Sequence, residues 1–579
     1  MAFGYHGRYL RIDVSTGHAE QVPLRGGLLR QYLGGSGLGT RLLIDEDAAT
    51  ADPVSPQAPI VFAFSPLVGT PVTTSAKFAV VCRSPLTERI NDALAGSGFA
   101  IAGKACGCDA VVVVGRAREW SVLIIDDGAA RLEPADDLRG DTCAVAEGKL
   151  RAKLGTQYRI AAIGPGGERG VRFATISHDG RHAGRGGAGA VLGSKNLKAI
   201  AVRGTHQCEW AHPHRLIELS RDLSERSFGP ATAKYRELGT ATNLLTLNRF
   251  GALPTRNFQR ARFDEAPQFA PAALGAAHAR VRASCVACTI GCEHLYAVDG
   301  APVRAEYESL FALGSLCGVG DATAVLRASR RCDEFGIDTI STGGTIAFAM
   351  ECVERGLLGE RWLTFGSGDA VLKAIELIGR REGIGDLLAD GSRRAAMALG
   401  HGSMAFAPQV KGLEIPGYEP RALQTMALGF AVGARGADHN RSGAYEVDFS
   451  DKVDRRHATV DSVRHAIDTE DRAALMDSLI LCKFLRGVFA DFYAESAELL
   501  HAVTGWDVTA GELRDTARRI IAAKREFNMR AGWTPQEDTL PERFLNGPLP
   551  DDPAAVLTAD GLRELVTEYH RQRGWATGE

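Results

Sequence analysis

The sequence lacks several features that mark particular classes of protein. No stretch approaches the roughly 18 consecutive apolar residues of a membrane-spanning helix, and the opening residues MAFGYHGRYLRID hold no apolar core of a secretory signal. Basic residues are not in excess, because 67 Lys and Arg stand against 70 Asp and Glu, for a net charge of −3. We therefore expect a cytoplasmic protein with no membrane span and no nucleic-acid partner.

The chain also lacks the cysteine pattern of a disulfide scaffold. Its 12 cysteines are scattered over 579 residues, and in a cytosolic protein closely spaced cysteines more often bind metal than pair with one another. Glycine, by contrast, is abundant, with 66 residues in short clusters such as GRGGAG. These clusters indicate many turns that press closely against a neighbouring group.

One cysteine cluster has the spacing of an incomplete metal site. Cys285, Cys288 and Cys292 form C-x2-C-x3-C, and three thiolates do not complete a four-ligand site. Structural zinc usually takes two CxxC or HxxxH halves, whereas an iron–sulfur cubane often takes three local cysteines and a distant one. His294 follows Cys292 too closely for a usual zinc ligand. Cys482 is the best distant candidate, so the pattern favours a cubane and leaves zinc open.

A glycine-rich loop lies near the end of the strand-rich part of the chain. Gly184, Gly186 and Gly189 satisfy G-x-G-x-x-G, which is typical of dinucleotide sites when an acidic residue follows about 20 residues later. That acidic residue is missing, and no array of parallel strands and helices follows. The loop instead offers backbone N–H groups beside Arg181 and Arg185, which suits a phosphate or a polar heterocycle.

Two short segments resemble each other at a distance. DEFGID (333–338) and DSLILC (477–482) each begin with Asp and end with Asp or Cys in a helical region. An Asp in this position can accept hydrogen bonds from a ring system, and two copies suggest two related ligand halves. Coincidence is the competing interpretation.

Three further residues have a reactive and an ordinary interpretation. Glu308, beside Tyr307 and apolar residues, would serve as an acid or base if burial raised its pKa, or would simply begin a solvated helix. A single His in a glycine-rich loop, such as His439, is most often a surface residue. Cys317 is most often a packed thiol.

The periodicity of apolar residues predicts an α+β fold. Short β-branched runs such as APIVFAF and DAVVVVG precede residue 205, with a hairpin turn at Ser15-Thr16-Gly17. Helical spacing begins at about residue 213, and Ser367 is a candidate helix cap. We predict a β-rich N-terminal domain (1–208), a helical domain with the cysteine cluster and the first Asp motif (209–415), and a helical C-terminal domain with the second motif (416–579). The cofactor would lie at their junction.

Taken together, these stretches resemble the aldehyde:ferredoxin oxidoreductase family of tungsten enzymes nearly end to end. The resemblance rests on GRYLRIDVSTG, GPGGERGVRFATISHDGRHAGRGGAGAVLGSKNLKAIAV, CVACTIGC, EYESLFALG and DEFGIDTISTGGTIAFAMECVERG. It implies a tungsten or molybdenum ion held by the dithiolenes of two molybdopterins, a nearby [4Fe–4S] cluster, and oxidation of aldehydes to carboxylates. The electrons would pass to a ferredoxin-like acceptor or an iron–sulfur carrier subunit.

The resemblance also implies roles for individual residues. Cys285, Cys288, Cys292 and Cys482 match the family's cluster ligands, and Glu308 and His439 match its acid–base residues. The cofactor-binding positions are Lys77, Leu94, Gly96, Arg181, His182, Ala183, Gly184, Asp333, Ile337, Asp338, Arg435, Arg441, Asp477 and Leu481.

Several of the family's positions are changed in this chain. Lys77 replaces an arginine, which keeps the charge but loses the bidentate fork. Leu94 replaces an asparagine that helps to hold a magnesium ion between the pterins, which is tolerable if the backbone carbonyl makes that contact. The second Asp motif has Ile480 where the family has Gly. Arg327 and Arg330 stand where an iron bridges subunits through Glu and His, so any oligomer is not expected to be iron-bridged.

Two other functions remain open at this stage. Cys317 lies nine residues after Glu308, and a cysteine near this position would ligate the metal in branches of the family that reduce aromatic rings. That favours a related oxidoreductase of another substrate class. A non-catalytic iron–sulfur carrier would hold a cluster without a pterin, and the Asp motifs argue against it.

Overall fold

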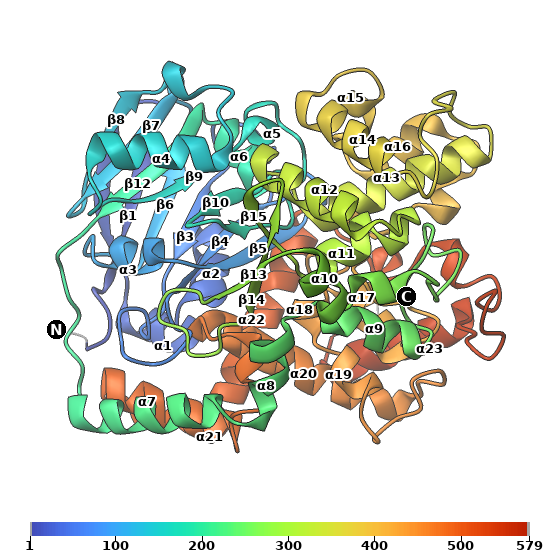
Figure 1. The fold of residues 1–579 in the computed structure, drawn as a ribbon. Helices are drawn as coiled ribbons and strands as arrows, with labels where there is room; N and C mark the ends of the chain where they lie inside the picture. Colours follow the sequence, from blue (N-terminus) through green and yellow to red (C-terminus); the bar gives the residue numbers. More distant parts are fainter. Residues whose placement is uncertain (1–2, 576–579) are drawn as a thin grey trace.

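Strands and helices separate along the chain. The computed structural model describes residues 3–575, and Figure 1 shows the strands of the first third gathered on one side with helices beside and below them. The first 12 strands end at Arg203, and helices dominate the rest of the described chain. The predicted α+β class, with a β-rich N-terminal part, is therefore confirmed.

The N-terminal part contains two six-stranded sheets. The first has the order β2-β1-β6-β3-β4-β5, with strands β1 Arg8–Asp13, β2 His18–Pro23, β3 Ile60–Ala63, β4 Lys77–Arg83, β5 Ile90–Gly96 and β6 Ala110–Val114. The second has the order β8-β7-β12-β9-β10-β11, with strands β7 Ser121–Asp126, β8 Ala129–Pro134, β9 Arg159–Ala162, β10 Ile176–His178, β11 Arg181–Ala183 and β12 Leu197–Arg203.

The two sheets share one topology. Each strand of the second sheet has the same position as one strand of the first sheet whose number is lower by six, so that β7 corresponds to β1 and β12 to β6. The only parallel pairs, β1 with β6 and β7 with β12, also correspond. The edge strands β5 and β11 contact each other where the sheets meet. The N-terminal part is thus one strand arrangement built twice.

Helices lie between the strands of each sheet. They are α1 Gly26–Tyr32, α2 Gly35–Asp45 and α3 Gly98–Lys104 in the first, and α4 Cys143–Leu154, α5 Pro165–Glu168 and α6 Ala188–Gly193 in the second. Because these helices cover the sheets, β3 and β6 are buried along their whole length, as their unbroken apolar runs require. The predicted hairpin is confirmed, with β1 and β2 joined through residues 14–17.

The next part of the chain is mostly helical. Its helices are α7 Pro213–Ser227, α8 Pro230–Leu238, α9 Thr242–Arg249, α10 Pro271–Ala277, α11 Tyr307–Leu313, α12 Ala322–Phe335, α13 Thr339–Glu354, α14 Gly368–Arg380, α15 Ile384–Leu388 and α16 Ser392–Leu399. A small sheet, β13 Arg280–Ala283, β14 Glu293–Val298 and β15 Ala301–Arg304, interrupts them, and the cysteine cluster joins β13 to β14. Ser367 caps α14 as predicted, because its side chain accepts a hydrogen bond from the Ala370 N–H at 3.1 Å.

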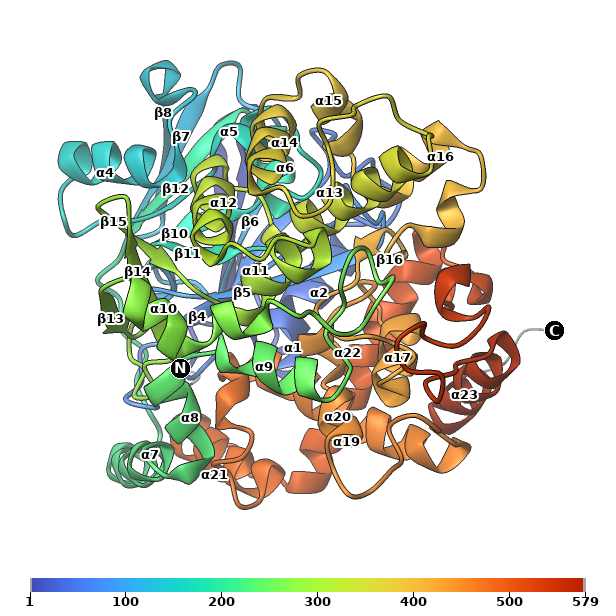
Figure 2. The same cartoon turned by 45° about the vertical axis from the view of Figure 1, so that its right-hand side comes forward.

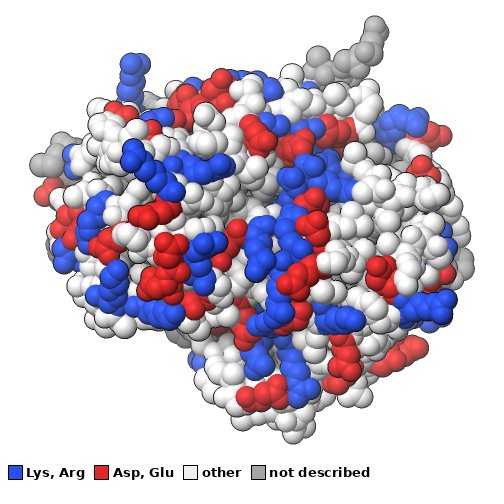
Figure 3. All heavy atoms as spheres, turned by 90° about the horizontal axis from the view of Figure 1, so that it is seen from above, with Lys and Arg blue, Asp and Glu red and all other residues white. Residues whose placement is uncertain are grey.

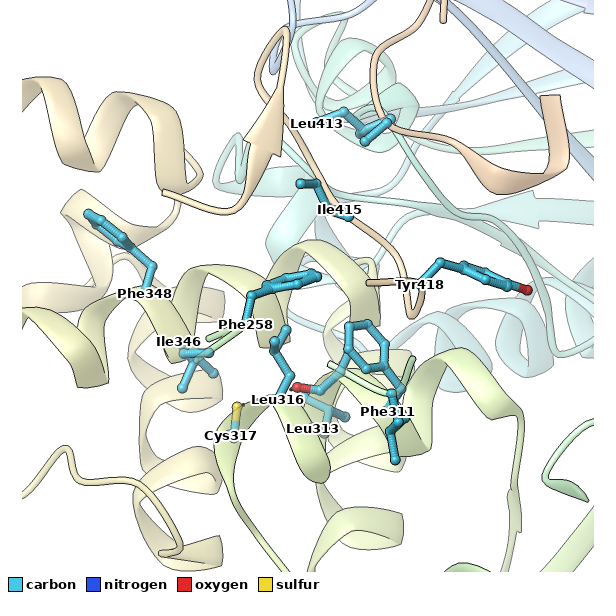
Figure 4. Close-up of a cluster of buried hydrophobic side chains, with 14 of the residues drawn as sticks. Phe258, Phe311, Leu313, Leu316, Cys317, Ile346, Phe348, Leu413, Ile415 and Tyr418 are labelled. Carbon is cyan, nitrogen blue, oxygen red and sulfur yellow. Dashed lines mark hydrogen bonds between the residues drawn. The ribbon is translucent and has the colours of Figure 1, made fainter. Parts of the chain in front are cut away.

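The last part begins after a short strand pair, β16 Gln409–Val410 with β17 Leu413–Glu414. Its helices are α17 Gln424–Val432, α18 His439–Ser442, α19 Tyr445–Asp448, α20 Val460–Leu479, α21 Phe492–Thr504, α22 Ala510–Arg530 and α23 Ala559–Gln572. A core that includes Phe258, Phe311, Leu316 and Phe348 joins both helical parts (Figure 4). The domain limits at 208 and 415 stay predictions.

The surface carries charges of both signs. Figure 3 shows Lys and Arg interspersed with Asp and Glu on the face seen from above. Among the described residues, no single helix is long and apolar enough to cross a membrane, and one pair, Tyr307–Cys317 with Ala322–Phe335, reaches that length only with a bend of 118°.

Candidate active site

A cavity of about 910 Å³ lies between the two sheets and the helical parts. All of the predicted site residues line it except Gly96 and Ala183. Ala183 is buried on β11, and a Cβ on Gly96 would lie 3.4 Å from the Cys285 sulfur, so both positions lie just behind the lining. The fold therefore brings these distant segments together, while their roles remain predictions.

The two Asp motifs have the same backbone geometry. Asp333 lies in the last turn of α12, which ends in left-handed Gly336 (φ 66°), and Asp338 then caps α13. Asp477 lies in the last turn of α20, which ends in left-handed Ile480 (φ 66°), and Cys482 then begins a 3-10 turn. Two matching helix ends facing one cavity argue against coincidence. Ile480 occupies this conformation at a steric cost that a Gly would not have.

Each sheet supplies one glycine turn to one motif. A Cβ on Gly164, which precedes α5, would collide with the Phe335 carbonyl at the end of α12. A Cβ on Gly35, at the start of α2, would collide with the Asp477 carbonyl at the end of α20. The turns are not at equivalent places in the two sheets, since Gly35 precedes β3 and Gly164 follows β9, yet each contacts one Asp motif. We define the doubled cradle as these two glycine turns with the two Asp motifs.

Buried arginines give the cavity unused hydrogen-bond donors. Arg185 donates to the carbonyls of Ala437 and Glu414, yet its Nε has no hydrogen-bond partner among the described residues. The same holds for Nε and Nη2 of Arg435. Burying such donors without partners is costly. They fit an anionic, acceptor-rich molecule such as a phosphorylated pterin.

Basic side chains pair with the Asp motifs around the cavity. The Arg441 guanidinium is 3.2 Å and the Lys483 ammonium 2.9 Å from the Asp477 carboxylate. On the other side, His182 lies 3.5 Å from Asp333, and its Nδ1 is 2.7 Å from the Thr175 hydroxyl. Each Asp motif therefore has its own basic partner.

A threonine ties the two cysteine segments together. The Thr74 N–H donates to the Ala287 carbonyl at 2.6 Å, and the Thr74 hydroxyl accepts from the Cys482 N–H at 3.1 Å. Lys77 lies beside these cysteines. Burial lowers the pKa of the Lys77 ammonium, but the thiolates of Cys482 and Cys285 outweigh this and raise it. Cys482 is thus beside the cysteine loop, as predicted.

The spacing of these cysteines bears on the choice between zinc and a cubane. Within residues 3–575, no group of three or more His, Cys, Asp or Glu side chains has the spacing of a single-ion site. Zinc would hold four thiolates about 2.3 Å from one ion, whereas a cubane spreads its four thiolates over four irons. The choice stays a prediction, for which three local cysteines and the distant Cys482 favour the cubane.

Glu308 and His439 lie close to each other at the cavity, away from the Asp motifs. His439 Nε2 lies 3.5 Å from one Glu308 carboxyl oxygen, and the other oxygen accepts from the Gly417 N–H at 3.1 Å. Neither the first oxygen nor His439 Nδ1 has a hydrogen-bond partner in the described chain. The Tyr418 ring packs on His439 with centroids 5.2 Å apart. His439 is buried, so its ordinary interpretation as a surface residue is wrong.

Burial sets the protonation of this pair. It raises the pKa of Glu308 to about 8, although Gly417 and Arg185 oppose the change. It lowers the pKa of His439 to about 4, against the pull of Asp438. At neutral pH, Glu308 is therefore mostly protonated and His439 is neutral.

Cys317 does not belong to the site. Its thiol donates to the carbonyls of Ala312 at 3.3 Å and Gly343 at 3.6 Å. Figure 4 shows it among Leu316 and Ile346 in the core. Burial raises the pKa of its thiol, so it stays protonated. The structure therefore supports the interpretation of Cys317 as a packed thiol and not as a metal ligand.

We expect Cys317→Ala to keep full activity, because the side chain does not reach the cavity. The loss of a small buried group should cost about 1–2 kcal/mol of unfolding free energy. Dye-linked turnover and denaturant unfolding of the variant check this. A loss of turnover in a folded protein would restore the metal-ligand interpretation.

Two buried acids that pair with the cavity arginines belong to no sequence motif. Asp92 on β5 is buried, accepts from the Ser36 hydroxyl at 2.6 Å and pairs with Lys524 at 2.8 Å. Asp438 caps α18 and lies 3.6 Å from Arg435. A charged residue within an apolar strand run was a usable signal for Asp92. Asp438 has local partners, since it caps α18 through the N–H groups of Asn440 and Arg441, but its approach to the cavity depends on the fold of the whole loop.

Arg327 and Arg330 lie on the surface of α12. Arg327 donates to Asp299 at 2.8 Å, and Arg330 lies 3.8 Å from the same carboxylate. Both guanidinium groups thus pair with an acid.

Comparisons with known proteins agree with the predicted family. The family model described as "Aldehyde ferredoxin oxidoreductase, N-terminal domain" matches residues 9–204. The model described as "Aldehyde ferredoxin oxidoreductase, domains 2 & 3" matches residues 219–579. A tungsten-containing aldehyde ferredoxin oxidoreductase of Pyrococcus furiosus is 37% identical, over 99% of this chain and 96% of that protein. The WOR-like subunit of an aliphatic sulfonate oxidoreductase from the same organism is 26% identical, over 99% and 95%.

A solved structure shares the fold. The active-site complex BamBC of benzoyl coenzyme A reductase with 1,5-dienoyl-CoA has a TM-score of 0.84 at 22% identity, over 100% of this chain and 95% of that chain. With both parts of the family description matched along almost the whole sequence, the chain belongs to the aldehyde ferredoxin oxidoreductase family of oxidoreductases.

Proposed function

We propose that the chain oxidises aldehydes to carboxylates at a tungsten (or molybdenum) bis-molybdopterin centre. Electrons would leave through a [4Fe–4S] cluster to a ferredoxin-like acceptor. The doubled cradle carries this proposal, because two equivalent helix ends around one cavity suit two copies of one ligand. The name of the tungsten-containing relative supports the choice of metal.

The cavity residues divide between the two pterins. Asp333, Asp338 and the loop from Arg181 to Gly184 would hold one pterin, and Asp477 the other. Leu94 would offer its backbone carbonyl to a magnesium ion between them. The metal centre, when bound, supplies a Lewis acid and accepts two electrons.

Glu308 and His439 would transfer the protons that the oxidation releases. Oxidation of an aldehyde consumes one water and gives a carboxylate, three protons and two electrons. The Glu308 carboxylate, whose free oxygen faces His439, would take a proton from the water or from the aldehyde hydrate. Neutral His439 would orient the carbonyl oxygen and pass protons outward.

The raised pKa of Glu308 predicts a pH profile. A proton acceptor must be ionised, so kcat/KM should rise with pH up to a plateau above about pH 8. Each pH unit below the pKa should lower the rate about tenfold. His439 stays neutral over this range. The profile is measured between about pH 6 and 9.5 with a dye acceptor, and a flat profile would contradict the role.

An aldehyde panel tests the proposed activity. The protein is produced without oxygen in medium with tungstate or molybdate, and aliphatic and aromatic aldehydes are assayed by viologen reduction. Turnover that requires one of the two metals is expected. A protein that carries the metal, pterins and cluster but oxidises no aldehyde would overturn the proposal.

A second candidate is oxidation of another substrate class, supported by the 26% identity to the sulfonate enzyme. Cys317 no longer supports this candidate, because its thiol is hydrogen-bonded in the core and would not ligate the metal. Aliphatic sulfonates in the same panel separate the two candidates.

A further inference from the structure

The surface beside the cysteine cluster is exposed and basic. We call it the exit face and define it as Lys234, Leu238, Arg280, Arg282 and Val286. Leu238 is 40% exposed and Val286 is 41% exposed, and the three charged residues are exposed as well. β13, which carries both arginines, is the edge strand of its sheet and pairs only with β14. Figure 2 places β13 at the margin of the molecule, beside α10.

The charge of the exit face is opposite to that of the whole protein. Three cations stand against one exposed acid, Glu237, in a chain with a net charge of −3. The Arg280 side chain donates to the Glu237 carbonyl at 3.2 Å, which anchors it to the end of α8. Arg282 makes no hydrogen bond or ion pair with any described residue, so its charge remains available to another molecule.

The exit face is carried by segments next to the cysteines. Cys285 follows β13 by two residues, and Val286 lies between Cys285 and Cys288 in the sequence. Next to Lys234 in the sequence, the Tyr235 ring stacks on Phe484 with centroids 4.1 Å apart, and both rings pack against the same buried cluster as Cys288 and Cys292. The cysteine cluster thus adjoins a basic surface with two exposed aliphatic side chains.

We infer that the exit face is the docking surface for a small acidic iron–sulfur protein, an inference that rests on the proposed function. Each carrier would take one electron from the reduced cluster, so two carriers are reduced for each aldehyde oxidised. Complementary charge speeds encounter and sets orientation. The few aliphatic groups suit a brief contact between electron-transfer partners, whose interfaces are small.

Reversing the charge of Arg282 tests the docking surface. With a purified acidic ferredoxin as acceptor, Arg282→Glu should raise the KM for ferredoxin about three- to tenfold and weaken its dependence on salt. Arg282→Lys should behave like the unaltered protein. Dye-linked aldehyde turnover should not fall in either variant, because dyes need no docking surface.

The matched control is Arg361→Glu, an exposed arginine in the loop after α13 with no ion pair in the described chain. It should leave both assays unchanged. An unchanged KM for ferredoxin in Arg282→Glu, or an equal loss in the dye assay, would overturn the inference. Absence of dye-linked turnover in the unaltered protein would instead refute the proposed function, so the two failures are distinguishable.

Discussion

Glu308→Gln should lower aldehyde turnover by about two to four orders of magnitude, the usual contribution of a positioned acid or base, while both cofactors stay bound. Glutamine has nearly the same shape, and its amide oxygen can still accept from the Gly417 N–H. It cannot take a proton. Turnover with a dye acceptor, together with metal and pterin content, measures the effect, and the rise of activity with pH should disappear.

Glu414→Gln is the matched control for this variant. Glu414 is also a buried carboxyl whose pKa burial raises, and it accepts hydrogen bonds from the Ser392 N–H and hydroxyl, each at 2.8 Å. Its side chain does not line the cavity. We expect turnover within a few-fold of normal. Full turnover in Glu308→Gln would exclude the acid–base role.

Cys482→Ala should abolish the cluster and with it the transfer of electrons to any protein acceptor. Three thiolates leave one iron of a cubane without a protein ligand. Burial raises the pKa of the Cys482 thiol, but the nearby Lys77 ammonium outweighs this and lowers it, which favours the thiolate form that binds metal. Iron analysis and the electron paramagnetic resonance signal of the reduced protein measure the loss.

Cys208→Ala provides the control, because Cys208 is also partly exposed but lies 3.3 Å from His6, far from this site in the sequence. It should keep all of its iron. Pterin content distinguishes loss of the cluster from unfolding of the segment, since Asp477 belongs to the same motif as Cys482. A fully occupied cubane in Cys482→Ala would contradict the assignment.

Much of the fold follows from local patterns. β3 and β6 are continuous apolar runs, and the Ser367 cap fixes the start of α14. The doubled topology could not be predicted, because topology depends on pairings between distant strands. β5 and β11, which meet at the centre, are INDALAG and RHA and share no motif. Only the two Asp motifs hinted at the duplication.

The candidate site likewise contains residues that the sequence could predict and residues that it could not. Residues in motifs, such as Cys285 or Asp333, could be placed from the sequence and its resemblance to a family. Whether Glu308 and His439 are buried could not, because Gly417 and Tyr418 approach them from a loop more than 100 residues after Glu308. For Cys317 the sequence left a metal ligand open beside the more usual packed thiol, and the structure supports the packed thiol.

The central claim is that one cavity binds two pterins and one metal beside a cubane. Elemental and pterin analysis of protein produced without oxygen, with tungstate or molybdate supplied, tests it most directly. We predict about one tungsten or molybdenum, about two molybdopterins and about four irons per chain. Four irons with no pterin and no tungsten or molybdenum would contradict the account.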